Sequence, residues 1–340
     1  MRYVTLGKTD LTVSEVGFGC IPILRFSKDD SVKVLRHAFE RGITFFDTAN
    51  AYRDSEEKIG IAFAGMREKV VIASKTLMRG ADEANAHLEN SLRMLRTDHL
   101  DLYQLHQIAQ EKDWLQVTGP AGALEAVMKA KAAGKIRYVG VSSHNLQMAL
   151  KLVRTGLFDT VQFPFNLIEE GAKDELIGAS KQMGMGFICM KPFGGGVIDN
   201  AAVAFKYLRG HAGVIPIPGF ETIGQVDQIV SFYSEANVVN DQDLEVMQNY
   251  RNELGKRFCR RCEYCQPCPQ GVMITPAMGY PIVASRMSPA VAMEFCKNAI
   301  ESVLLCNECG ACIERCPYEL PVPKILKANY ALYQKHLQTI

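Results

Sequence analysis

Eight of the eleven cysteines lie in two short motifs in the last quarter of the chain. The first motif, C-x2-C-x2-C-x2-C-P, contains Cys259, Cys262, Cys265 and Cys268. The second motif, C-x2-C-x2-C-x3-C-P, contains Cys306, Cys309, Cys312 and Cys316. Thiolates that recur at three-residue intervals can ligate the successive metal ions of one compact cluster. Zinc is the main alternative, although structural zinc sites usually combine two separated C-x2-C units.

The second motif has the spacing of bacterial ferredoxins, in which three thiolates hold one [4Fe–4S] cluster and the fourth ligates a neighbouring cluster. The first motif resembles it but is one residue shorter before its final Cys-Pro. Under the same rule, one cluster uses Cys259, Cys262, Cys265 and Cys316, and the other uses Cys306, Cys309, Cys312 and Cys268. Because no cysteine of the motifs is then left over, two clusters are expected, with a single cluster as the alternative.

The other three cysteines, Cys20, Cys189 and Cys296, lie in apolar stretches of the sequence. We expect them to be buried, reduced thiols that pack as small hydrophobic side chains. Disulfides are not expected, because the chain is neither small nor evidently secreted.

Upstream of the motifs, short apolar runs alternate with longer amphipathic runs from about residue 13 to 236. The eight strand-like runs are VSEVGFG, ITFFDT, VVIASK, LDLYQLH, IRYVGVS, TVQFPFN, GFICMKP and GVIPIPG. The stretches between them, such as ADEANAHLENSLRML, have helical patterns, and several end in Gly. Eight βα units predict a closed parallel (β/α)8 barrel. An open doubly wound sheet is disfavoured, because no G-x-G-x-x-G follows the first strand.

The alternating pattern ends after residue 236. Helical runs at 241–258 and 288–305 lead into the two cysteine motifs, and the long, mainly helical segment between the motifs contains Pro276, Gly279 and Pro281. We therefore predict an α/β chain with a barrel domain at residues 1–254 and a small, mainly α-helical, ferredoxin-like iron–sulfur domain at residues 255–340.

Polar residues follow three of the strand-like runs, where a barrel of this kind carries its chemistry. They are Asp47 and Tyr52 in FFDTANAY, Lys75 in ASK and His106 in LYQLHQ. With YVTLGKTDLTVSEVGFG, GKIRYVGVSSHN and IPIPG, these residues make the chain resemble the aldo-keto reductase superfamily over most of residues 1–236. Barrel and tail together resemble aldo-keto reductases that carry a C-terminal ferredoxin-type domain.

The resemblance implies that Asp47, Tyr52, Lys75 and His106 are a catalytic tetrad for hydride transfer between a nicotinamide cofactor and a carbonyl or alcohol substrate. Reduction of a carbonyl needs a proton for the developing alkoxide, and Tyr ordinarily has a pKa near ~10. Lys75 is expected to lower the pKa of Tyr52, and Asp47 to hold Lys75 charged and in place. A neutral His106 would hydrogen-bond the carbonyl oxygen.

The same resemblance implies a set of cofactor-binding residues. They are Ser142, Ser143, Gln162, Met190, Phe193, Gly194, Gly195, Gly219, Glu221 and Gln225. The two serines and Gln162 match positions that bind the nicotinamide carboxamide, and Met190 replaces the family's usual stacking aromatic residue. The glycine loop after Phe193 resembles the segment around the pyrophosphate.

Glu221 follows the eighth strand, where NADP-dependent members of the family place Lys or Arg. No Lys or Arg occurs between residues 210 and 250. A carboxylate repels a 2′-phosphate and can accept hydrogen bonds from a ribose hydroxyl, so NAD(H) is favoured over NADP(H). On the substrate side, Ile21, Ile23 and Trp114 suggest an apolar pocket. Arg25 and Arg53 are candidates for binding a substrate carboxylate, with solvated surface charges as an equal alternative.

The bulk composition excludes several classes of protein. The formal net charge is +1, which gives no electrostatic reason to expect nucleic acid or an anionic membrane as a partner. No apolar run approaches the ~20 residues that span a bilayer, and the N-terminus lacks the apolar core of a signal peptide. A cytoplasmic protein with a small-molecule substrate is expected.

Three hypotheses describe how barrel and tail work together. The first is an NAD(P)(H)-dependent carbonyl reductase or alcohol dehydrogenase with structural or regulatory clusters. The second is an electron-transfer oxidoreductase that couples NAD(H) to an external redox partner protein, although no flavin motif is present to convert two-electron into one-electron steps. The third is a non-catalytic nicotinamide-binding redox sensor, which the complete tetrad disfavours.

Overall fold

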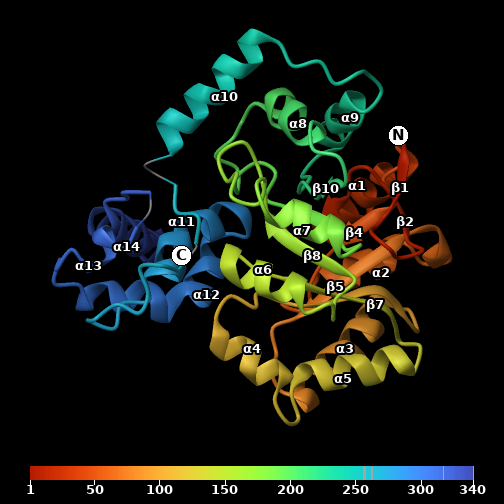
Figure 1. Cartoon of the computed structure of the whole chain (residues 1–340), viewed down its shortest axis with the longest axis horizontal. Coiled ribbons are helices and arrows are strands. Elements are labelled where there is room, and N and C mark those ends of the chain that lie inside the picture. The colour runs from red at the N-terminus through yellow and green to blue at the C-terminus, as the bar shows by residue number, and fades with distance from the viewer. Residues whose placement is uncertain (256–257, 262, 317, 340) are drawn as a thin grey trace. The chain divides into compact units, whose positions relative to one another are not determined.

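The computed structural model describes residues 1–255, 258–261, 263–316 and 318–339. The chain divides into two compact units, Met1–Asp241 and Gln242–Ile340. The boundary between the units, after Asp241, comes earlier in the sequence than the predicted domain boundary after residue 254. The helix α10 (Asp241–Leu254) therefore falls almost entirely within the second unit. The red-to-green and the cyan-to-blue parts of Figure 1 correspond approximately to the two units.

The first unit is built on a curled sheet of eight parallel strands. They are β3 (Phe18–Gly19), β4 (Phe45–Asp47), β5 (Val71–Thr76), β6 (Leu100–Leu105), β7 (Ile136–Ser142), β8 (Thr160–Pro164), β9 (Gly186–Met190) and β10 (Val214–Pro216). Each lies within one of the eight expected strand-like runs, except that β5 extends one residue beyond its run, to Thr76. Backbone hydrogen bonds from Gly17 N to Pro216 O (2.9 Å) and from Gly19 N to Pro218 O (2.8 Å) join the two edges. The architecture is consistent with a (β/α)8 barrel.

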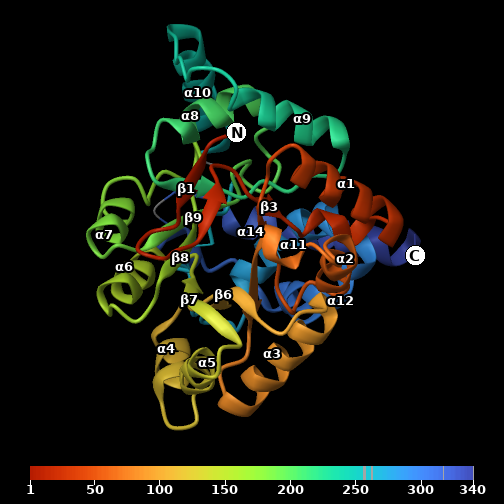
Figure 2. The same ribbon diagram turned by 90° about the vertical axis from the view of Figure 1, so that its right-hand side faces the viewer.

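Helices surround this sheet, as Figure 2 shows for α1, α3, α7 and α9. The helices of the first unit are α1 (Lys28–Glu40), α2 (Ser55–Ala62), α3 (Ala81–Leu95), α4 (Glu111–Thr118), α5 (Ala123–Ala132), α6 (Leu146–Arg154), α7 (Leu176–Gln182), α8 (Ala201–Arg209) and α9 (Ile223–Phe232), with short 3-10 helices at Pro22–Arg25 and Arg67–Lys69. The expected N-terminal hairpin is formed by β1 (Tyr3–Thr5) and β2 (Thr12–Ser14). Residues Leu6, Leu11 and Val13 from this hairpin region pack with Phe45 and Ile188 in one buried cluster.

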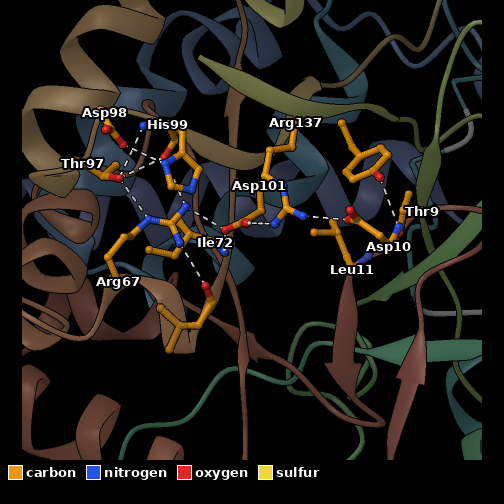
Figure 3. A network of polar contacts seen from close by, with 12 residues as sticks. Thr9, Asp10, Leu11, Arg67, Ile72, Thr97, Asp98, His99, Asp101 and Arg137 are labelled. Carbon is orange, nitrogen blue, oxygen red and sulfur yellow. Dashed lines mark hydrogen bonds and ion pairs between the residues drawn. The ribbon is translucent and has the colours of Figure 1, made fainter. Parts of the chain in front are cut away.

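A buried ion-pair network ties the amino ends of the central strands together (Figure 3). The carboxylate of Asp101, at the start of β6, accepts hydrogen bonds from Arg67 (2.7 Å), Arg137 (2.9 Å) and the Ile72 backbone (2.9 Å). Arg137 also contacts Asp10 at 2.7 Å, which links β7 to the N-terminal hairpin. This end of the sheet is therefore fixed by charge pairs whose buried atoms are all bonded within the described residues.

The second unit is helical. Its elements after α10 are α11 (Ile274–Arg286), α12 (Pro289–Glu301), a 3-10 helix at Ser302–Leu305, α13 (Ala311–Glu314) and α14 (Val322–Thr339). Buried residues of α11, α12 and α14, including Tyr280, Ala292 and Leu326, form one core, and six of the motif cysteines pack against it. In the described part of the chain, no helix has the length and apolar character that crossing a bilayer requires.

Candidate functional site

Four side chains predicted to act together converge at the carboxyl ends of β4, β5 and β6. The ammonium group of Lys75 donates to Asp47 Oδ1 (2.6 Å) and to the backbone oxygen of Thr48 (2.5 Å). The same nitrogen lies 5.3 Å from the centre of the Tyr52 ring. The rings of Tyr52 and His106 meet edge to face, with centroids 6.0 Å apart. A carboxylate, an amine, a phenol and an imidazole therefore share one small volume.

Parallel pairing explains why residues distant in sequence meet here. Asp47 ends β4 and is aligned with Ala73 of β5, and Lys75 is aligned with Gln104 of β6. The loops that follow are also anchored, because the Tyr52 backbone nitrogen donates to Ala49 O (2.9 Å) and that of His106 to Thr76 O (2.9 Å). Strand register and loop hydrogen bonds together hold all four side chains at the same edge of the sheet.

Burial controls the charges at this site. It raises the pKa of Asp47, against the opposing effects of Lys75 and of the hydrogen bonds from Gln162 and Gln104. Burial also lowers the pKa of His106 well below its ordinary value, helped by the nearby charge of Lys75. The imidazole is therefore neutral at physiological pH, as expected.

The expected acidification of Tyr52 by Lys75 is wrong for this structure. Removal from water raises the pKa of Tyr52, and the charges of Asp47 and Cys20 act in the same direction. The ammonium of Lys75 donates its hydrogen bonds to Asp47 and Thr48. The phenol stays protonated at neutral pH.

Several buried polar atoms beside the tetrad have no hydrogen-bond partner among the described residues. Gln162 donates its amide nitrogen to Asp47 (3.4 Å), but its Oε1 is left without a donor, and so are Gln104 Oε1 and His106 Nδ1. Ser142 is aligned with Gln162 in the sheet, and Ser143 donates its backbone nitrogen to Gln162 O (3.1 Å). An unpaired amide oxygen next to two serines suits the donor and acceptor groups of a nicotinamide carboxamide.

The predicted pyrophosphate segment follows β9, which ends at Met190. Its glycines adopt left-handed backbone angles, with φ 58° at Gly194 and 76° at Gly195, a conformation that favours glycine. Phe193, by contrast, packs its ring against Phe205 (5.6 Å between centroids). The loop therefore combines an anchored aromatic residue with backbone that can approach a ligand closely.

Glu221, in the segment after β10, lies next to a cation from another loop. Its carboxylate forms an ion pair with Arg25, and its backbone nitrogen donates to Gln225 Oε1 (2.7 Å). Gly219 lies so close to Pro22 that an added Cβ would come within 2.4 Å of the proline ring. The loops after the first and last strands of the sheet are thus joined, and Arg25 is engaged by Glu221.

Sequence reasoning missed two residues near the tetrad, Lys191 and His144. Lys191 Nζ lies 2.5 Å from His144 Nε2, and the charge of Lys191 contributes to the lowered pKa of His106. Lys191 also has a left-handed backbone (φ 58°), unusual for a residue with a side chain. Its position directly after a strand end was the available signal. Trp114, expected near the substrate, packs against Phe158, which precedes β8.

The motif cysteines of the second unit line two separate hollows. Cys259, Cys265 and Cys316 line the first cysteine hollow, and Cys262 lies outside the described residues. Cys268, Cys306, Cys309 and Cys312 line the second cysteine hollow. In each hollow the Cys-Pro cysteine of one motif meets cysteines of the other motif, which is the exchange expected from the spacing.

The described residues include no group of three or more His, Cys, Asp or Glu placed to hold a single metal ion. The four thiols of the second hollow are nevertheless near enough to interact. Burial raises the pKa of Cys312, and Cys306, Cys268 and Cys309 add to the increase. The isolated cysteines Cys20 and Cys189 are fully buried thiols and Cys296 is nearly so, as expected.

The fold and the converging side chains define a barrel-type oxidoreductase, and comparison with known proteins identifies its family. The model of the aldo/keto reductase family matches residues 15–202, so the chain belongs to this family. The uncharacterized oxidoreductase YrpG of Bacillus subtilis is 31% identical over 246 residues, covering 63% of this chain and 71% of that protein. The aldo-keto reductase YhdN of the same species is 30% identical over 255 residues, covering 67% and 75%.

Solved structures show the same fold. The holo form of aldo-keto reductase AKR11C1 from Bacillus halodurans superposes with a TM-score of 0.62 at 23% identity, covering 73% of this chain and 96% of that one. An aldo-keto reductase from Klebsiella pneumoniae, solved in complex with NADPH, has a TM-score of 0.59 at 26% identity, covering 74% and 95%.

Proposed function

We propose that the first unit reduces a carbonyl substrate with hydride from a nicotinamide dinucleotide. The observation that carries this proposal is the assembly of Asp47, Lys75, Tyr52 and His106 at the carboxyl ends of the strands. The cofactor, when bound, supplies the hydride. The Tyr52 hydroxyl donates a proton to the carbonyl oxygen, and neutral His106 orients that oxygen by a hydrogen bond.

The cofactor-binding residues are proposed on the fit of this site. Unpaired Gln162 Oε1 would accept from the carboxamide, with Ser142 and Ser143 beside it. The glycine loop from Gly194 would approach the pyrophosphate. NAD(H) remains our proposal, because the carboxylate of Glu221 pairs with Arg25, a cation that the loop after β3 brings to it. The NADPH complex of the Klebsiella pneumoniae relative supports the broader class of cofactor.

We further propose that the second unit holds two [4Fe–4S] clusters, one in each cysteine hollow. The support is the pairing of cysteines across motifs, which a single cluster would not need. Electron exchange with a redox partner protein is a second candidate function. It is favoured by the exposed Cys309 and by exposed Leu304, Leu305 and Ile313 next to motif cysteines.

An anaerobic screen of aldehydes and ketones with both cofactors tests the reductase proposal. The iron-replete protein should oxidise reduced cofactor only when a carbonyl compound is present, and it should bind NADH more tightly than NADPH. Absence of turnover across aliphatic, aromatic and carboxylate-bearing carbonyls would reject the reductase assignment. Tighter NADPH binding would reject only the cofactor preference.

Iron and acid-labile sulfide per chain test the cluster proposal. About eight iron atoms and eight sulfides support two clusters, whereas about four support one. For the second candidate function, chemically reduced protein is mixed with oxidised cofactor and its visible spectrum is followed. If the clusters stay reduced, direct coupling between them and the cofactor is ruled out.

A further inference from the structure

The first cysteine hollow contains buried hydrogen-bond donors that have no acceptor among the described residues. Arg261 has two such nitrogens, Nε and Nη2, and Thr275 has its hydroxyl oxygen. Both residues line the hollow together with Cys259, Cys265 and Cys316. Thr275 is only 7% exposed, so water has little access to it.

Buried donors without acceptors are costly. Each one destabilises the folded protein, and a charged donor does so more than a neutral one. Native proteins leave few of them, and an absent ligand or ion is one explanation for an unmatched group. Here the missing acceptor must be negatively charged or electron-rich, because one of the donors is a guanidinium group.

The second cysteine hollow differs in charge and in hydrogen bonding. None of its lining residues has an unpaired buried side-chain atom within the described part of the chain, and none is Lys or Arg. Its charged residue is Glu308, whose carboxylate pairs with Lys327 at 2.5 Å. Asn307 uses its side-chain oxygen to accept from the Cys309 backbone (3.2 Å).

We propose that Arg261 and Thr275 donate hydrogen bonds to the sulfur atoms of the cluster in the first hollow, and that this cluster has the higher reduction potential of the two. The inference rests on the proposal that the hollows hold [4Fe–4S] clusters. Reduction adds one electron, and therefore one negative charge, to a cluster. A neighbouring cation and hydrogen bonds to sulfur stabilise the reduced form and raise the potential.

Water near the exposed Cys309 also stabilises a reduced cluster in the second hollow. The test therefore compares the reduction potentials of variants with those of wild type, and does not rely on the difference between the two clusters in wild type. The reconstituted protein is reduced stepwise under anaerobic conditions, and electron paramagnetic resonance follows each cluster. Wild type should show two steps. Thr275→Val and Arg261→Gln should each shift the upper step to lower potential and leave the lower step in place, and the double variant should shift it further. Glu308→Gln, the matched control in the second hollow, should move only the lower step, and upward.

Iron content separates the possible failures. If wild type binds neither iron nor sulfide, the cluster proposal itself is rejected. If all variants retain about eight iron atoms and neither step moves in Thr275→Val or Arg261→Gln, the clusters stand and the hydrogen-bonding inference is rejected. If Arg261→Gln loses iron, Thr275→Val decides alone, because it removes a hydroxyl while keeping the side chain's shape.

Discussion

Two carboxylates in the first unit, Asp101 and Asp47, are equally buried and hydrogen-bonded. They differ in whether the neighbouring side chains keep buried polar atoms that have no hydrogen-bond partner. Each is only 3% exposed and each accepts several hydrogen bonds. Around Asp101, at the amino ends of the strands, no buried atom of Arg67 or Arg137 lacks a partner in the described structure. Around Asp47, at the carboxyl ends, Gln104, Gln162 and His106 each keep one unpaired atom.

The difference shows what each network is for. A complete network gains nothing from a ligand, and it stabilises the fold. An incomplete network bears the cost of unpaired groups until a ligand supplies their partners. Unpaired atoms alone do not mark a site, since Tyr103 and Thr160 also carry one each within strands of the sheet. At Asp47 they coincide with an amine, a phenol and an imidazole.

The largest expected effect comes from Tyr52→Phe, which removes one hydroxyl from the incomplete network. Turnover with a carbonyl substrate should fall by roughly 10²–10⁴, the usual contribution of a general acid. The affinity for the cofactor and the melting temperature should not change. Steady-state rates, cofactor titration and thermal unfolding measure these three properties.

Tyr103→Phe is the matched control, because it makes the same chemical change at a buried phenol outside the tetrad. It should retain wild-type turnover. Equal turnover in Tyr52→Phe and wild type would show that Tyr52 is not the proton donor.

Asp101→Asn should produce the opposite result, with a loss of stability and no loss of chemistry. Removing one member of a buried ion pair leaves its partners' charges uncompensated and costs about 3 kcal/mol, the low end of the usual range, since Arg137 is 40% exposed. Denaturant unfolding measures the loss, and turnover is assayed well below the melting temperature.

Asp10→Asn serves as its control, because Asp10 is 67% exposed and pairs with the same Arg137. Its cost should stay below about 1 kcal/mol. If Asp101→Asn instead abolished turnover in folded protein, the division between a stabilising and a functional end would be refuted.

Much of this comparison could be predicted from the sequence. Continuous apolar runs identified all eight strands. Because the strands are parallel, their carboxyl ends lie at the same edge of the sheet, where Asp47, Lys75 and His106 can meet. The charge balance could not be predicted, because the raised pKa of Tyr52 depends on how completely the folded chain removes the phenol from water and on the charge of Asp47 beside it.

The second unit shows the same limit of sequence reasoning. Proline ordinarily disfavours a helix interior, yet Pro276 and Pro281 both lie within α11. Pro276 is in the first helical turn, where no backbone donor is needed, and the buried face around Tyr280 holds the helix despite Pro281. Packing of that kind is invisible to a local pattern. The cross-motif cysteine pairing stays a prediction from the spacing, and cysteines of both motifs line each hollow.

The direction of the pKa shift at Tyr52 predicts a difference between forward and reverse reactions. Reduction uses the protonated phenol, which burial stabilises, so its rate should stay flat between about pH 6 and pH 9. Alcohol oxidation uses the phenolate and should rise about tenfold per pH unit over that range. The lowered pKa of His106 removes any acid limb near its ordinary value. Profiles of kcat/KM against pH, recorded for carbonyl reduction and for alcohol oxidation, test both expectations. A plateau in the oxidation profile at neutral pH would mean that bound cofactor restores the effect of Lys75 on Tyr52.

A third carboxylate, Glu221, combines features of Asp47 and Asp101. It lies at the carboxyl ends of the strands, as Asp47 does, but it is held in an ion pair with Arg25. If this pair is functional, Glu221→Gln should release Arg25 to attract a 2′-phosphate, and NADPH affinity relative to NADH should rise about tenfold, or about 1.4 kcal/mol. Arg25→Gln should shift the ratio the other way, because the carboxylate then repels the phosphate unopposed. Fluorescence titration with both cofactors gives the ratios, and unfolding curves give the stabilities. Unchanged ratios with lowered stability in both variants would place Glu221 with Asp101, as a structural pair that happens to lie at the functional end.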